Sequence, residues 1–382
     1  MSAGRKKIVR GLQLTAAGGM VLLAVALLST VFYGKAADLD FIGYWISGRL
    51  MKEHANPYSR TAILQLEEKM GSDLHVPIVM RNPPWSLFMV APLGFMSMQV
   101  AAFVWLLAMI VALVVSIRLL SAGSKPPPVI VYLFAPVLYT AMSGQTPLFF
   151  LLGIAVFFHF YERRPWWAGA ALTLAAIKPH LFVLFWPILL IDCIRNRRYR
   201  ILAGAVAGLV AATAIAFVFD HHVVADYLTS MRDEHMELHY MPNLPCSLRM
   251  LVPGRPEWVQ VTPAVLGVFW AIWFYWRKRA AWDWTDQGAL LLCVSVLVSP
   301  YSWPFDQVLF LPAILKVLSK PVAKSTVAGL VTVSGIAAVM ILKFSITSPV
   351  YVWTGPAWLG WYLWARQRTV EPVASEPVLA AS

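Results

Sequence analysis

The chain has 382 residues, of which 59% are hydrophobic and only 13% are charged. Many apolar runs approach the roughly 20 residues that span a bilayer, so the composition excludes a soluble domain and favours a polytopic membrane protein. The net charge of +12 comes from short basic clusters between apolar runs. Such clusters are typical of cytoplasmic loops, so we expect the lipid bilayer as a partner and no nucleic acid.

The first apolar run begins after a basic cluster at residues 5–10 and extends to Tyr33. It is too long for a signal-peptide core of roughly 7–15 residues, which predicts an uncleaved helix with the N-terminus inside. Residues 34–86 are then expected to form a long outside loop. Within it, Ser59 to Met70 has apolar residues at helical spacing, which predicts a short helix on the membrane surface.

The remaining spans are predicted from apolar runs that end at basic clusters or at polar, proline-containing breaks. Basic clusters flank both ends of Trp166 to Ile194, which predicts a hairpin of two short helices turning at Lys178-Pro179-His180. A second outside loop is expected at 220–258, with a short helix at 225–238. The other helices are expected at 85–120, 127–142, 147–161, 201–219, 259–276, 286–298, 307–319, 325–343 and 350–365.

This pattern predicts an all-α fold with about twelve transmembrane helices, some of them short enough to need tilted or thinned surroundings. Residues 1–366 are expected to form a single integral membrane domain, and 367–382 a cytoplasmic tail. Both termini are expected inside, because lysine and arginine are in excess in the segments assigned to that side.

This topology places five polar segments on the outer face. Each has a simpler explanation when taken alone: a turn or helix cap, a lysine reaching the headgroups, interfacial aromatics or a solvated loop. Their coincidence on one face favours a functional site, because ionisable groups beside or within a membrane are costly to bury. The segments are Asp38/Asp40, Asn82-Pro83-Pro84, Gly144-Gln145, Lys178-Pro179-His180 and Ser299 to Asp306.

The ordered set of motifs resembles glycosyltransferase family 87, a group of C-type (GT-C) membrane enzymes that includes polyprenyl-phosphate-mannose-dependent α-mannosyltransferases of bacterial envelopes. The resemblance covers residues 38–310 and differs at one point, because many relatives carry a histidine where this chain has Pro304-Phe305-Asp306-Gln307. The motifs are Asp40-Phe41-x-x-Tyr44-Trp45, Asn56-Pro57-Tyr58, Pro83-Pro84, Gly144-Gln145, Lys178-Pro179 and Ser299-Pro300-Tyr301-Ser302-Trp303.

The resemblance implies an inverting hexosyltransferase, with mannose as the sugar, in the inner (plasma) membrane with its active site on the extracytoplasmic face. The donor would be a polyprenyl-phosphate-linked sugar and the acceptor an envelope glycolipid or glycan. The catalytic carboxylate in the first outside loop of the family maps to Asp40.

The residues suit this chemistry. Asp40 is our candidate base, with Asp38 as its rival or as an orienting group. Cations or helix N-termini must hold the phosphate as its charge grows. The candidates for the phosphate are Lys178, His180 and Arg81; for sugar hydroxyls Gln145, Asn82 and Tyr301; and for stacking on a ring Trp45 and Trp303. Tyr44 and Asp306 complete the expected substrate-binding set.

We expect no metal and no cofactor. Asp38 and Asp40 could recruit a divalent ion, but further ligands at suitable spacing are missing. Two other function classes stay open from the residues alone. A transporter or flippase for a lipid-linked sugar would place polar breaks near the bilayer midplane, and a structural membrane subunit would not depend on Asp40.

Overall fold

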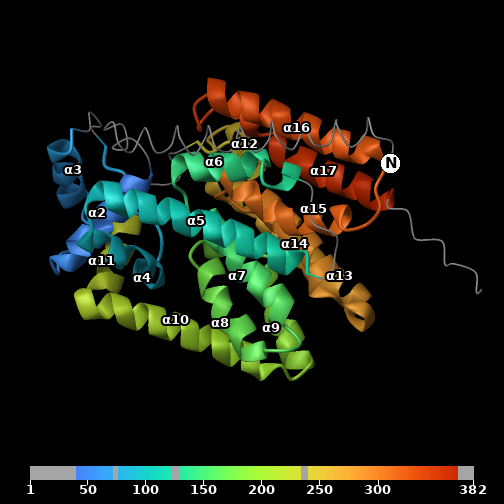
Figure 1. Cartoon of the computed structure of the whole chain (residues 1–382), viewed down its shortest axis with the longest axis horizontal. Helices are drawn as coiled ribbons and strands as arrows, with labels where there is room; N and C mark the ends of the chain where they lie inside the picture. The colour runs from blue at the N-terminus through green and yellow to red at the C-terminus, as the bar shows by residue number, and fades with distance from the viewer. Residues whose placement is uncertain (1–39, 72–75, 123–128, 234–239, 369–382) are drawn as a thin grey trace, which may run out of the picture.

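Figure 1 shows the computed structural model of the chain, which describes residues 40–71, 76–122, 129–233 and 240–368. All regular structure in these ranges is helical. The expected first helix, Asp38 and most of the expected tail lie outside the described residues.

The α-helices of 20 residues or more are the long elements of the bundle: α5 (Met98–Leu120), α10 (Tyr199–Phe219), α13 (Glu257–Lys278) and α16 (Lys324–Lys343). The shorter α-helices are α2 (Phe41–Lys52), α3 (Arg60–Lys69), α4 (Leu87–Val90), α6 (Ala135–Ser143), α7 (Pro147–Phe160), α8 (Pro165–Ala175), α9 (Phe185–Arg195), α11 (Val223–Asp233), α12 (Leu244–Met250), α14 (Ala289–Val298), α15 (Leu311–Leu318) and α17 (Thr354–Gln367).

Short 3₁₀ segments and one π-helical segment connect many of these helices in the described part of the chain. The short 3₁₀ segments are η2 (Pro84–Ser86), η3 (Ala91–Phe95), η4 (Val129–Val131), η5 (Pro179–Phe182), η7 (Arg279–Ala281), η9 (Pro304–Phe310) and η10 (Pro349–Tyr351), and η8 (Trp284–Gly288) is a π-helical turn.

Four helices are long and apolar enough to cross a membrane by length and composition: α5, α10, α16 and the α13–η7 segment Glu257–Ala281. Their outer faces carry rows of exposed apolar side chains, such as Val206 and Val210 on α10 and Val265 and Phe269 on α13. A soluble protein rarely exposes apolar surface of this extent, whereas a lipid-facing helix requires it. The chain is therefore a helical membrane protein.

The expectation of about twelve spans is not confirmed. Proline and glycine break several apolar runs into helices too short to cross a bilayer alone. The clearest case is 85–120, expected as one run. Pro92 lies in η3, and the side chain of Ser97 accepts a hydrogen bond from the Val100 amide, so α5 begins only at Met98.

The expected hairpin at 166–194 is present as α8 and α9, which are separated by η5 at the predicted turn. Its two ends return to one place, because Arg198 after α9 forms a 2.6 Å ion pair with Glu162 before α8. Arg195 and Arg279 both lie against the ring of Trp276, at 5.5 and 5.3 Å. The basic clusters that end α9 and α13 thus meet, and α2, α3 and α11 gather at the opposite end of the long helices (Figure 1).

Helices α8 and α10 pack along their lengths through small residues. A Cβ added at Gly169 would collide with the carbonyl oxygen of Ile201, and one at Gly204 with that of Trp166. Gly208 follows Gly204 by one turn, and a Cβ added there would meet the Thr173 hydroxyl and the Ala170 carbonyl oxygen of α8. This is the small-xxx-small arrangement by which membrane helices bring their backbones into contact.

We predict that Gly204→Ala lowers stability by about 1–3 kcal/mol, because the added methyl forces α8 and α10 apart. Thermal unfolding in detergent measures the effect. Gly335→Ala is the matched control, since Gly335 is also mid-helix but has no atom within 4 Å of an added Cβ. There the change should be neutral or slightly stabilising. Equal unfolding temperatures for both variants would contradict the packing argument.

Candidate functional site

A cavity of about 700 Å3 lies where the polar helix junctions converge. It is bordered by the start of α2, the turn between α6 and α7, the tip of the α8–α9 hairpin and the segment before η9. All five polar segments predicted from the sequence contribute to it, each through at least one described residue. The predicted site residues in its lining are Asp40, Tyr44, Arg81, Asn82, Gln145, Lys178, His180, Tyr301 and Trp303.

Asp40 directly precedes α2 and is held by a short chain of hydrogen bonds. The side-chain amide of Gln145 donates to Asp40 Oδ2 at 2.7 Å, and the Tyr44 hydroxyl donates to Gln145 Oε1 at 2.9 Å. Since Tyr44 and Asp40 belong to the same helix start, Gln145 is clamped between them. Asp40 itself lines the cavity.

The turn that presents Gln145 is itself fixed. Gly144 ends α6 in the left-handed conformation (φ 67°), where a side chain would be strained and would also press on Phe41. Its carbonyl accepts a 2.8 Å hydrogen bond from the indole of Trp105. Gly144 therefore allows the close approach of this turn to α2 and so positions Gln145 at Asp40.

The environment of Asp40 suits a base. Burial raises the pKa of Asp40, and the hydrogen bond from Gln145 and the charges of Lys178 and Arg81 oppose that rise. A carboxylate with a raised pKa binds a proton more readily than a solvated aspartate does, which suits a group that accepts a proton near neutral pH.

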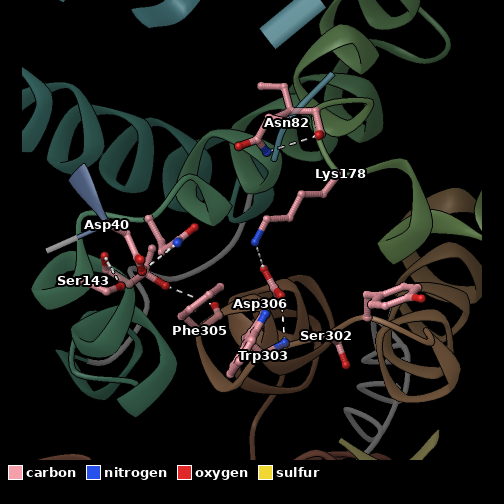
Figure 2. Close-up of polar contacts among 12 residues, drawn as sticks. Asp40, Asn82, Ser143, Lys178, Ser302, Trp303, Phe305 and Asp306 are labelled. Atoms are coloured by element: carbon pink, nitrogen blue, oxygen red, sulfur yellow. Dashed lines mark hydrogen bonds and ion pairs between the residues drawn. The ribbon is translucent and has the colours of Figure 1, made fainter. Parts of the chain in front are cut away.

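Lys178 and Asp306 form a buried ion pair across the cavity floor (Figure 2). The ammonium lies 3.0 Å from Asp306 Oδ1, with side-chain exposures of 14% and 0%. The second oxygen of Asp306 accepts the Trp303 amide at 2.9 Å, and the Lys178 ammonium lies 4.7 Å from the centre of the Phe305 ring. Lys178 is thus held inside the protein and does not extend to the headgroups.

Neither member of the ion pair lies in an α-helix. The turn after Lys178 is the four-residue 3₁₀ segment η5 with Pro179 first, and α9 begins only at Phe185. Asp306 was expected to bind substrate, yet it does not line the cavity. Because both its oxygens have protein partners, it holds Lys178 and Trp303 in place.

His180 and Asn82 occupy opposite edges of the hairpin tip. The His180 ring lies edge-on to Tyr301 at 6.0 Å, and burial, aided by the nearby charge of Lys178, lowers its pKa to about 3. His180 is therefore neutral at physiological pH and can form hydrogen bonds in the cavity but supplies no positive charge there. Asn82 donates to the carbonyl of Ile177 at 3.3 Å, which ties the 76–83 segment to the hairpin.

Trp45 is not brought to the cavity. Its indole donates to the carbonyl of Met96 at 3.2 Å, on the other side of α2. The expected stacking residue is therefore a packing residue, whereas Trp303 does line the cavity, stacked on Phe305 at 6.2 Å.

Tyr227 and Met231 of α11, together with Met241, form a second wall of the cavity that was not predicted from the sequence. The helix at 225–238 was expected, but no pattern in it indicated which face would turn inward. The ring of Tyr227 lies tilted against that of Tyr58, with centroids 5.4 Å apart, which connects α11 to the predicted first outside loop. Among the described residues, no group of three His, Cys, Asp or Glu side chains could hold a metal ion.

Comparison with known proteins gives one match. The model of glycosyltransferase family 87 matches residues 81–300, more than half of the chain. This range includes Arg81, Gln145, Lys178 and Ser299 and ends just before Tyr301. No curated protein and no solved structure matches the chain.

We predict that Lys178→Met makes folding stability fall as pH rises. Burial already raises the pKa of Asp306, and the Lys178 charge opposes that rise. Without the cation the folded state keeps Asp306 protonated, so its pKa exceeds the unfolded value. The stability present at low pH is then lost as pH rises through the folded pKa.

Unfolding temperatures measured between about pH 5 and pH 8 test this, because that window separates a raised carboxyl pKa from the ordinary value. The Lys178→Met/Asp306→Asn double variant is the control and should lose the added pH dependence. A Lys178→Met profile parallel to the wild type would show that the pair does not control the ionisation of Asp306.

Proposed function

The chain belongs to glycosyltransferase family 87, and from this premise we propose that it transfers a hexose, mannose in the first instance, from a polyprenyl-phosphate-linked donor to an envelope glycolipid or glycan. The observation that carries the proposal is Asp40, clamped by Gln145 in a cavity of about 700 Å3 whose lining also holds Lys178 and Arg81. A base and two cations in one cavity at the ends of membrane helices suit a sugar carried on a lipid phosphate.

The proposed reaction is a single inverting displacement. The acceptor hydroxyl gives its proton to Asp40 as its oxygen bonds to the anomeric carbon, and the bond from that carbon to the phosphate oxygen breaks. The leaving group is an ionised lipid phosphate, so the step needs no strong general acid. The donor phosphate gains charge as it leaves, and cations must stabilise that charge.

Lys178 and Arg81 are proposed to hold the phosphate. Asp306 engages one of the three ammonium N–H groups of Lys178, so others can donate to phosphate oxygens. The aspartate keeps the ammonium in place, and its negative charge weakens the attraction between Lys178 and the phosphate. A weaker attraction helps the lipid phosphate to dissociate after transfer.

The sugar is proposed to bind between Gln145 and Tyr301, with Trp303 along its face, since these side chains line the cavity beside Asp40 and Lys178. The proposed acceptor side is the wall of Tyr227, Met231 and Met241. We place the cavity on the extracytoplasmic side of the inner membrane, because it lies opposite the helix ends where the basic clusters meet.

The decisive experiment is transfer by purified protein. Radiolabelled polyprenyl-phosphate sugars are incubated with the protein and a membrane extract, and the labelled product is identified. We expect label to move from the donor to a glycolipid or glycan. Label that crosses vesicles without leaving its carrier would instead indicate a transporter.

We predict that Asp40→Asn lowers transfer by about 100- to 10,000-fold, the usual cost of losing a positioned base. The variant should fold and bind donor as the wild type does, because asparagine can still accept the hydrogen bond from Gln145. Single-turnover rates and donor binding on equal amounts of folded protein measure both. Glu53→Gln, an exposed change on the same helix, is the control. Near-normal turnover of Asp40→Asn would exclude Asp40 as the base.

The proposed orientation gives a second prediction, which uses the two ends of α13. A membrane-impermeant maleimide added to intact cells should label Glu257→Cys but not Lys278→Cys, since both positions are exposed and only the first would lie outside. The native cysteines are all buried, so background labelling should be low. Labelling of Lys278→Cys before the cells are permeabilised would reverse the orientation.

A further inference from the structure

The wall of the cavity formed by residues 76–83 has no regular secondary structure. Its position is therefore set by the groups that contact it and not by a helix of its own. Hydrogen bonds from other elements hold it at Ile78 and at Asn82. Val79, Met80 and Arg81 lie between these two attachment points, which together with the buried side chains of Val79 and Met80 help to set where the Arg81 side chain begins.

The attachment at Asn82 involves the first outside loop and the hairpin. The Tyr58 hydroxyl donates to the Asn82 carbonyl at 2.9 Å, and the Asn82 amide donates to Ile177. These contacts tie the end of the wall segment to elements that already surround the cavity.

The attachment at Ile78 comes from α3, which does not line the cavity. The Ile78 amide donates to Glu67 Oε1 at 2.9 Å, and the Ile78 carbonyl lies directly against Gly43. The next residue, Val79, is buried in a small apolar cluster with Ile42 of α2 and Ile63 of α3. The surface helix thus holds the wall segment against α2 (Figure 1).

Glu67 is an unfavourable choice for mere packing. It is fully buried, and its Oε2 has no hydrogen-bond partner among the described residues. A buried carboxylate with a single hydrogen bond costs free energy that leucine at the same position would not. Burial also raises the pKa of Glu67. The single contact that requires an acceptor at this position is the one to the Ile78 amide.

We propose that Glu67 is a positioning residue, which fixes residues 76–83 through the Ile78 amide and thereby places Arg81 at the phosphate end of the cavity. This inference rests on the proposed function, because Arg81 matters only if a phosphate binds there. The charged groups that act on Asp40 are Lys178 and Arg81. Displacement of Arg81 would therefore also change the pKa of Asp40, the proposed base.

The test compares Glu67→Leu, Glu67→Gln and the control Glu68→Gln, whose residue is the exposed neighbour on α3. We expect Glu67→Leu to fold at least as stably as the wild type and to raise the donor KM about tenfold, as loss of a hydrogen bond to a charged group typically does. Glu67→Gln should restore most of the affinity, because its amide oxygen can accept from Ile78. Glu68→Gln should match the wild type.

The pH profile separates positioning from general structural damage. With Arg81 displaced, less positive charge acts on Asp40, so the pKa of Asp40 rises and the acid limb of kcat/KM moves to higher pH. Arg81→Gln should give the same shift, and Glu67→Leu/Arg81→Gln should give no more than either single variant. Additive shifts in the double variant would overturn the proposal.

Hydrogen exchange reads the attachment without any transfer assay. In Glu67→Leu, amides of the peptide containing Ile78 should exchange faster, while those of α2 stay as in the wild type. If Glu67→Leu transfers sugar with an unaltered donor KM and its amides exchange as in the wild type, the proposed role of Glu67 is wrong. The proposed transferase function is not affected by that result. If the wild type transfers no sugar, the proposed function fails, and unaltered exchange would overturn the attachment separately.

Discussion

The ion pair between Lys178 and Asp306 joins two junctions that lie 128 residues apart in the chain. Asp306 also accepts a hydrogen bond from the Trp303 amide. Its neighbour Phe305 connects η9 to α6, because the Thr140 hydroxyl donates to the Phe305 carbonyl at 3.1 Å. The hairpin tip, η9 and the end of α6 therefore form one unit. A buried pair adds little net stability, but removing one partner leaves an uncompensated charge, so the pair specifies a single arrangement of these junctions.

The opposite end of the bundle buries a carboxylate among neutral hydrogen-bond donors. Asp192 is almost fully buried and accepts hydrogen bonds from four donors, which come from the end of α7, the last turn of α9, α13 and η8. Tyr275, Trp284 and Asn196 donate at 2.9, 3.0 and 2.7 Å, and the hydroxyl of Tyr161 is the fourth donor. Neutral donors therefore satisfy both oxygens of Asp192, whereas Asp306 at the other end has one oxygen on the Lys178 ammonium.

The sequence predicted those parts of the fold that depend on local composition. The hairpin at 166–194 followed from basic clusters at both ends, and the Arg198–Glu162 pair agrees with it. The gathering of the polar junctions followed from the same topology. Pro92 and Ser97 signal the break before Met98, but the apolar composition of 85–120 led to the prediction of one continuous helix there.

Contacts between distant segments could not be predicted in this way. Nothing near Lys178 indicates that Asp306 is its partner, and nothing near Trp45 indicates that its indole turns to Met96 and away from the cavity. In the sequence, Glu67 precedes the charged residues Glu68 and Lys69 within the predicted surface helix. Only the fold shows that it faces inward to Ile78. Side-chain direction on a short helix depends on what packs against it, which periodicity alone leaves open.

Asp40 and Asp306 differ in what their oxygens contact, and this difference supports the different roles proposed for them. Asp306 has one oxygen on Lys178 and the other on the Trp303 amide, and it does not line the cavity. It could accept a proton only by giving up contacts that hold the cavity floor. Asp40 lines the cavity and has a side-chain partner in Gln145, whose hydrogen bond favours the ionised form. A base must reach the acceptor hydroxyl and be restored after each turnover, and of these two aspartates the contacts favour Asp40 for that proposed role.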